Sequence, residues 1–387
     1  MSDPLSPEYR LVALSAIASD ETLSRRLGEV DTDGLDWQRV DELARHHSVL
    51  AMIGARLENL VPGLLPGQFA SAAAADRARN LALHTAQAHQ TARLVRLLDR
   101  AGVRTLVLKG VPLVRMIYPA SPEWRYSSDI DLLIDPQDLA EADGLLRGSG
   151  YMRTWPDTNM AERLPFRTIR KFSKDYQYVS ADSAHYVELH FRLTLNPHVL
   201  AMPFDALCAQ SVEVDAGFGA MRVFDGPLLL GYLAWHALAD INQKLKWFAD
   251  VAWARRRIEA ADTAISSPPF SPGVPPRAVA LVEQVNSLLV GDAAVGGSGE
   301  ALRICREMDR AGVTARRRTL ARMPREVFFI AFQMRQVTGW RARLWFVWRA
   351  LVDPRDVLAL GGRELPAGAQ ALTGPFLAIW RYLRRYL

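Results

Sequence analysis

The sequence predicts an α+β fold in which an α/β core over residues 101–200 lies between helical regions at 1–100 and 201–387. Two observations support this prediction. Apolar residues recur at helical spacing on both sides of the core. Within the core, short branched-apolar runs alternate with turn-bounded helical stretches, in the order strand, helix, strand, helix, strand, strand. A chain of 387 residues is long enough for two or three structural units and a sizeable buried interior.

The N-terminal region is predicted to be helical. We expect one helical stretch over residues 40–60, ended by Pro62, because Leu43, Val49, Leu50, Ile53 and Leu57 recur there at near-helical spacing. A second helix is expected over residues 72–101, with Ser71 as its N-cap and Gly102 as its C-cap.

The core is predicted from four short apolar runs. A glycine turn at Lys109-Gly110 and Pro112 mark the start of one helix, and Pro136 opens another that extends to Leu146. The expected strands are 103–108, 129–134, 176–180 and 186–193.

The C-terminal region is expected to return to helix after Asn196-Pro197, with one or two helices over 228–257. Residues 263–276 are rich in proline and serine and are expected to form a loop. The net charge of +5 is concentrated in an Arg/Trp-rich tail over 316–387, whose only acidic residues are Glu326, Asp353, Asp356 and Glu364. Such a tail could contact phosphate, an acidic partner or a membrane surface, but we prefer a solvated helix face.

Cysteine usage and hydropathy narrow the class of protein. Cys208 and Cys305 are the only cysteines and form no Cys-x-x-Cys pair, which argues against a zinc site or a disulfide framework. The N-terminal segment lacks the apolar run of a secretory signal, and the longest apolar run, 227–239, is too short to span a bilayer. We therefore expect a soluble cytoplasmic protein.

The strand over 129–134 carries the strongest candidate site. Asp129 and Asp131 are two residues apart, so on a strand their side chains project from the same face. Two adjacent carboxylates repel one another and need a cation to remain ionised together. Mg2+ is the natural choice because it takes hard oxygen ligands and keeps positions for water and phosphate.

Two neighbouring segments could bind phosphate. Lys109-Gly110 follows a strand and precedes a helix, where glycine allows close backbone approach to an anion. Arg125, with Ser127 and Ser128, lies just before the aspartates and offers donors suited to phosphate. The plainer alternatives are a simple turn with a solvated lysine and a surface loop with a structural arginine–aspartate pair.

The strand over 186–193 offers a third carboxylate. Its alternation places Glu188, His190 and Arg192 on one face. An edge strand with one solvated face would have the same pattern. If this face lines a cleft instead, Glu188 completes a set of three carboxylates for a two-metal site.

These motifs resemble the uncharacterised nucleotidyltransferase family of the DNA-polymerase-β-like nucleotidyltransferase superfamily. The resemblance rests on Lys109-Gly110, the Arg-x-Ser-x-Asp-Ile-Asp-Leu-Leu-Ile run and Val-Glu-Leu-His-Phe, covers roughly residues 40–260, and extends to nucleotidyltransferase toxins of the abortive-infection type. It implies the polymerase-β-like mixed sheet, Gly110 as the signature glycine and metal binding by Asp129, Asp131 and Glu188. Val111 stands where classical members have serine, and Glu188 replaces the more usual aspartate.

The resemblance implies transfer of a nucleoside monophosphate from a nucleoside triphosphate to an unidentified hydroxyl or phosphate acceptor. It implies two Mg2+ ions, with Mn2+ as an alternative, and ATP or another nucleotide as donor. The expected nucleotide- and phosphate-binding residues are Lys109, Gly110, Arg125, Ser127 and Ser128. His190 would orient Glu188 or contact the acceptor, which could be a sugar phosphate, a peptide or protein, a small molecule or RNA.

Two other functions remain open at this point. One is an inactive core used as a binding or scaffolding module, which would bind nucleotide without releasing pyrophosphate. The other is a basic adaptor for an acidic partner, which would show strongly salt-dependent binding. It would use Arg341, Trp345, Trp348, Arg349, Trp380, Arg384 and Arg385.

Overall fold

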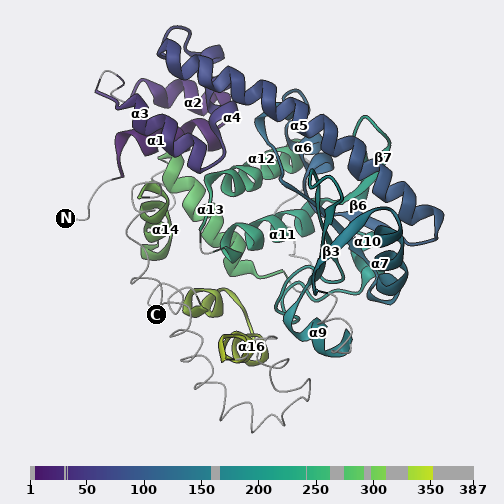
Figure 1. Cartoon of the computed structure of the whole chain (residues 1–387). Helices are drawn as coiled ribbons and strands as arrows, with labels where there is room; N and C mark the ends of the chain where they lie inside the picture. The colour runs from purple at the N-terminus through teal and green to yellow at the C-terminus, as the bar shows by residue number, and fades with distance from the viewer. Residues whose placement is uncertain are drawn as a thin grey trace, which may run out of the picture.

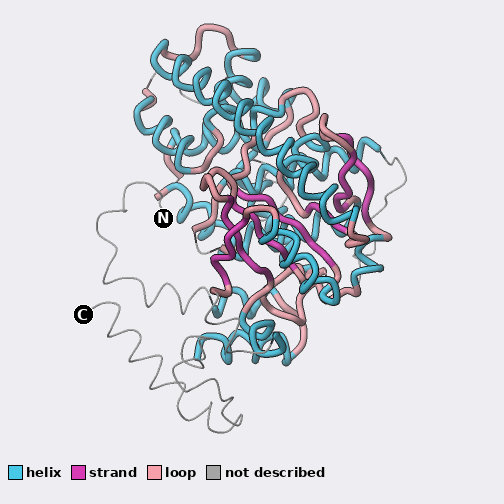
Figure 2. Tube along the Cα trace, turned by 45° about the vertical axis from the view of Figure 1, so that its right-hand side comes forward, coloured by secondary structure: helices cyan, strands magenta, loops and turns pink. Residues whose placement is uncertain are grey.

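The computed structural model describes residues 5–29, 32, 34–157, 166–240, 242–261, 274–291, 298–310 and 330–351. Most of the expected loop over 263–276 and most of the expected tail over 316–387 therefore lie outside the described residues. In the described part, helices surround a central sheet (Figures 1 and 2). This arrangement confirms the predicted α+β class with a mixed sheet. No described helix has the length and apolarity needed to cross a membrane.

The N-terminal helices are α1 (Pro7–Ile17), α2 (Asp20–Leu27), α3 (Trp37–His46), α4 (Leu50–Leu60) and α5 (Gly67–Arg100). The stretch predicted over 40–60 is divided between α3 and α4, because Ser48 adopts a positive φ of 58° that no α-helix accommodates. The N-cap prediction for Ser71 is wrong. Helix α5 begins at Gly67, directly after Pro66, so Ser71 lies within it. Gly102 follows the helix with φ of 80°, as expected of a glycine at a helix end.

The central sheet has five strands in the order β1-β2-β5-β4-β3. Only β2 and β5 pair in parallel among them; the other neighbours are antiparallel. The prediction missed β3, an edge strand, and placed the end of β5 too late. The strands are β1 (Thr105–Val107), β2 (Asp129–Ile134), β3 (Tyr151–Trp155), β4 (Asp175–Ser180) and β5 (Tyr186–His190).

Short helices connect these strands, namely α6 (Val111–Ile117), α7 (Leu139–Gly148) and α9 (Phe166–Phe172), with 3-10 turns at Pro122–Trp124 and Pro136–Asp138. The region after the sheet is not purely helical as predicted. A hairpin of β6 (Ser211–Asp215) and β7 (Ala220–Phe224) follows α10 (Phe204–Cys208). The helices that follow are α11 (Gly226–Ala239), α12 (Leu245–Ala261), α13 (Pro276–Val290), α14 (Gly299–Asp309) and α16 (Trp340–Leu351).

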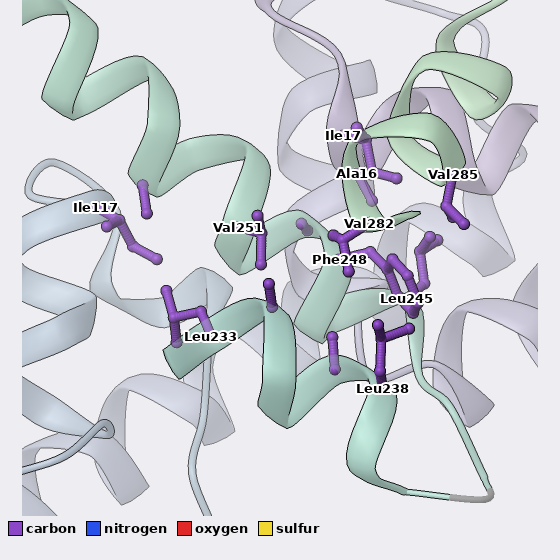
Figure 3. Packing of buried hydrophobic residues seen from close by; sticks show 14 of the residues in the cluster. Ala16, Ile17, Ile117, Leu233, Leu238, Leu245, Phe248, Val251, Val282 and Val285 are labelled. Atoms are coloured by element: carbon purple, nitrogen blue, oxygen red, sulfur yellow. The ribbon is translucent and has the colours of Figure 1, made fainter. Parts of the chain in front are cut away.

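The two faces of the sheet are buried against different layers. Ile130 and Leu132 of β2, with Val187 and Leu189 of β5, belong to the smaller core, which α5 and α7 complete. Leu133 points the other way, into a larger core shared with the N-terminal helices and with α11 to α13. Figure 3 shows part of that core, where Phe248 of α12 packs near Val282 of α13 and Leu233 of α11 lies on the side of Ile117. Because side chains alternate along a strand, Asp129 and Asp131 share the face of Leu133.

Candidate active site

The carboxylates lie at the pairing of the two parallel strands. Asp131 of β2 is opposite Glu188 of β5 in the register, and Asp129 is opposite Tyr186. Paired residues on neighbouring strands project from the same face, so Asp131 and Glu188 lie side by side. The side chain of Asp131 is fully buried, whereas 29% of Asp129 and 25% of Glu188 remain exposed. The site therefore has one deep carboxylate and two that reach the surface of a cavity.

His190 lies between two of these carboxylates. Its Nε2 atom is 3.2 Å from Oδ1 of Asp131 and 3.2 Å from Oε2 of Glu188. Burial and Lys174 disfavour a charge on the imidazole, but the hydrogen bonds to both carboxylates outweigh them and raise the pKa of His190. The histidine foreseen as a neighbour of Glu188 thus contacts Asp131 as well.

Two lysines balance the negative charge. Nζ of Lys109 is 2.8 Å from Oδ2 of Asp131 and 3.8 Å from Oδ2 of Asp129. Nζ of Lys174 is 3.0 Å from Oε2 of Glu188 and 2.8 Å from Oδ2 of Asp175. Burial alone would lower the pKa values of both lysines, but the neighbouring carboxylates raise them above the ordinary value.

The same balance acts on the carboxylates. Burial would raise the pKa of Asp131 and of Glu188, because it disfavours the charged form. Lys109 and His190 outweigh burial at Asp131, and His190 and Lys174 outweigh it at Glu188, so both pKa values lie below their usual range. Both carboxylates are therefore ionised at neutral pH and available as cation ligands.

Arg125 is held from outside the sheet. Its Nε donates to Oδ2 of Asp250 on α12 at 3.1 Å, and the hydroxyl of Tyr118 donates to Oδ1 of the same carboxylate at 3.3 Å. Both partners of the Arg125–Asp250 pair are almost fully buried. Arg125 nevertheless contributes to the cavity wall. The structural arginine–aspartate pair considered from the sequence is therefore present, but its aspartate, Asp250, lies far along the chain.

The glycine and serines predicted at the site surround Asp129. Oγ of Ser127 donates to Oδ1 of Asp129 at 3.0 Å, and Ser128 lines the cavity. Gly110 precedes α6 with φ of 72°, a backbone conformation that residues other than glycine rarely adopt. A Cβ on Gly110 would lie 3.9 Å from Cβ of Ser127. The turn therefore brings the backbone after β1 close to the Asp129 segment.

A cavity of about 840 Å3 opens beside these residues. Its wall includes Lys109, Asp129 and Glu188, and continues across α11 and α12. Burial and Arg125 lower the pKa of Lys246, on that wall, to about 7. The part of the wall outside the sheet includes Tyr232, Trp235, His236, Lys246, Trp247, Trp345, Phe346 and Arg349. Such a cavity combines a charged end with aromatic surface.

The residues present fit a divalent cation. Asp131, Glu188 and His190 each offer a ligand atom, and these atoms lie within 4.8 Å of one another. Carboxylate oxygens suit Mg2+ and Mn2+, and imidazole nitrogen suits transition metals. Asp129 lies on the cavity side of this group, where its carboxylate can face a ligand that enters from the cavity.

Sequence reasoning missed several residues of the site: Lys174, Tyr232, His236, Lys246 and Asp250. Lys174 directly precedes β4, and no local pattern distinguishes it from a solvated lysine. The other four lie on α11 and α12, in a segment that was interpreted only as helix. Its dense His, Lys and Asp content among apolar residues was the available signal.

Comparison with known families gives one match. A family model described as "Uncharacterised nucleotidyltransferase" matches residues 33–264. The matched segment contains the sheet, the carboxylates, both lysines and α11 and α12, but not residues 330–351 of the cavity wall. No curated protein and no solved structure matched the chain.

Proposed function

The chain belongs to the uncharacterised nucleotidyltransferase family, and on that premise we propose that it is a metal-dependent enzyme. It would transfer a nucleoside monophosphate from a nucleoside triphosphate to a hydroxyl or phosphate group of an acceptor. The observation that carries the proposal is the pairing of Asp131 with Glu188, with Asp129 beside them on the cavity wall.

Asp129, Asp131 and Glu188 are the proposed metal ligands. Divalent cations at such a site neutralise the triphosphate and favour ionisation of the attacking hydroxyl. The acceptor hydroxyl releases its proton to solvent as its oxygen attacks the α-phosphorus, the bond from that phosphorus to the oxygen bridging the α- and β-phosphates breaks, and pyrophosphate leaves. Glu188 lies on the cavity wall, where it can accept the hydrogen bond of the attacking hydroxyl and orient it.

The phosphate side of the site would be formed by Lys109, Gly110, Arg125, Ser127 and Ser128. Lys109 already lies within 3.8 Å of Asp129, so its ammonium can contact a phosphate bound next to that carboxylate. The Arg125 guanidinium adds positive charge while Asp250 fixes its orientation. Substrate phosphates would thus enter between the sheet and α12.

The alternative of an inactive binding module also has an observation in its favour. Lys109, Lys174 and His190 already balance the buried carboxylates without a metal ion. A scaffold protein could retain this charge network for stability alone. Such a protein would bind nucleotide, if at all, without releasing pyrophosphate.

The decisive screen incubates the protein with each of the four nucleoside triphosphates, Mg2+ or Mn2+, and pools of candidate acceptors. Pyrophosphate release is measured together with the mass shift of the acceptor. The enzyme proposal predicts equal amounts of pyrophosphate and nucleotidylated acceptor, both abolished in Asp129→Asn. Metal-dependent nucleotide binding with neither product would favour the binding module.

A further inference from the structure

We infer that His190 is itself a metal ligand and that, with Asp131 and Glu188, it forms a site that prefers Mn2+ to Mg2+. This inference rests on the proposed metal-dependent function and adds an imidazole ligand to its metal site. The three-carboxylate site expected from the sequence contained only oxygen donors. The structure instead places an imidazole nitrogen between two of those carboxylates.

The distances are those of a ligand face. In an octahedral site with bonds of about 2.1 Å, neighbouring ligand atoms lie about 3 Å apart. Nε2 of His190 is 3.2 Å from Oδ1 of Asp131 and 3.2 Å from Oε2 of Glu188. The three ligand atoms lie within 4.8 Å of one another, so an ion bound by the two oxygens would lie close to Nε2. Nε2 becomes the third ligand when it releases to solvent the proton that it shares with the carboxylates.

The surrounding contacts point the same way. Lys109 occupies the other carboxylate oxygen of Asp131, Oδ2, at 2.8 Å. Oδ1 is therefore the oxygen of Asp131 that faces the imidazole. At Glu188 the oxygen near the imidazole, Oε2, is also 3.0 Å from Nζ of Lys174, so an ion bound there would replace this lysine contact. Nε2, and not the buried Nδ1, is the nitrogen of His190 that lies 3.2 Å from an oxygen of each carboxylate. A histidine that only oriented one carboxylate would need contact with a single oxygen, whereas this nitrogen contacts one oxygen from each of two.

The ligand chemistry sets the preference. Mg2+ demands hard oxygen ligands, whereas imidazole nitrogen is a good ligand for transition metals. Mn2+ accepts carboxylates and imidazole together at similar bond lengths. A site of two carboxylates and one imidazole should therefore bind Mn2+ more tightly than Mg2+, and most of the difference should depend on His190.

The test uses Mn2+ alone as the probe, bound to the full chain, and needs no acceptor and no turnover. Pulsed electron paramagnetic resonance of the Mn2+ complex detects nitrogen directly bonded to the ion. We expect a nitrogen coupling in the wild type that changes on labelling histidine with 15N and disappears in His190→Gln. His236→Gln is the matched control, because His236 is half-buried and lines the adjoining cavity but is not among the three clustered ligands. The His236→Gln variant should retain the nitrogen coupling.

Calorimetric titration supplies the second readout. The ratio of Mn2+ to Mg2+ affinity should fall by at least about tenfold in His190→Gln and remain unchanged in His236→Gln. If His190→Gln does not fold, the 15N-histidine spectra of wild type and of His236→Gln still decide whether a histidine is bound and whether that histidine is His236.

Mn2+ bound without nitrogen coupling would overturn the inference and leave the carboxylate site of the proposed function intact. A nitrogen coupling lost in His236→Gln would also overturn it. Absence of any Mn2+ or Mg2+ binding would overturn both this inference and the metal dependence of the proposed function. The outcomes therefore separate failure of the ligand assignment from failure of the enzyme proposal.

Discussion

Asp131 and Glu188 face one another across the parallel pairing of β2 and β5, and a single imidazole nitrogen lies 3.2 Å from an oxygen of each. Because the pairing is in register, the backbone fixes the separation of the two carboxylates. The charge around them is set by groups from other elements: Lys109 after β1 and Lys174 before β4. The sheet therefore fixes the positions of the carboxylates, and lysines next to other strands supply the opposite charge.

Asp131→Asn should destabilise the metal-free protein. The substitution leaves Lys109 buried with less compensation, and breaking a buried ion pair typically costs about 3–5 kcal/mol of unfolding free energy. Two aspartates alone would repel one another, and loss of one charge would then be neutral; the lysine at 2.8 Å reverses this expectation. Urea unfolding of both proteins without metal measures the difference.

The double variant Lys109→Met/Asp131→Asn is the control for this prediction. It removes the buried cation together with the charge, so it should recover about half or more of the lost stability. Equal stability of wild type and Asp131→Asn would mean that the Lys109–Asp131 contact contributes nothing to the fold.

Lys109→Met should have opposite effects on the two ligands. Removing the ammonium frees Oδ2 of Asp131, so metal affinity should rise by several-fold, roughly tenfold at most. Affinity for a triphosphate in the presence of saturating metal should fall, because one phosphate contact is lost. Calorimetric titration with metal and then with a non-hydrolysable triphosphate measures both. Lys244→Met, a lysine outside the cavity wall, should leave both affinities near the wild-type value; a parallel loss of both in Lys109→Met would contradict this role.

Arg125→Met should lower the unfolding free energy by about 3–5 kcal/mol, because it leaves Asp250 buried without its partner. Arg125→Met/Asp250→Leu removes both charges and should recover most of that loss. The double variant then isolates the proposed phosphate contact. If triphosphate affinity remains reduced in the stable double variant, the contact is supported. Wild-type affinity in this variant would show that Arg125 contributes to the fold alone.

Lys246 should give the fold a pH dependence. Its pKa of about 7 lies below the ordinary value of 10.5, because burial and Arg125 disfavour its charge. Between these two pH values the unfolded chain binds more protons than the folded one, so this lysine makes stability rise with pH. Lys246→Met should therefore be more stable than wild type at pH 7 and below, with the gap closing toward pH 10.5. Urea unfolding across this range checks it, and a constant gap would contradict the assignment.

The sequence predicted the elements that carry a strong local pattern. The strand at Asp129–Ile134 was predicted with its observed bounds, because a short apolar run with two β-branched isoleucines favours a strand. Strand β3 was missed because it lies at the sheet edge, where Met152 is 64% exposed and polar residues interrupt the apolar run. The β6–β7 hairpin was missed although valine alternates with polar residues in β6, because strands of only five residues give a weak signal.

The site was predictable only where neighbouring residues define it. The shared face of Asp129 and Asp131 follows from strand geometry, whereas the facing of Asp131 and Glu188 also requires the two strands to pair in parallel and in this register. The contacts of Arg125 with Asp250, and of Lys174 with Glu188, depend on how helix α12 and strand β4 pack. A single sequence does not specify that packing, because each of these residues is locally compatible with a solvated position.

The central claim is that this chain transfers a nucleoside monophosphate from a nucleoside triphosphate, and that the carboxylates of β2 and β5 are needed for this transfer. Parallel incubations with α-labelled and γ-labelled nucleoside triphosphate, Mn2+ or Mg2+ and an acceptor pool test it most directly. The account predicts that the α-label reaches an acceptor, that the γ-label appears only in pyrophosphate, and that Glu188→Gln abolishes both products. Transfer of the γ-label to an acceptor, or unchanged α-label transfer in Glu188→Gln, would contradict it.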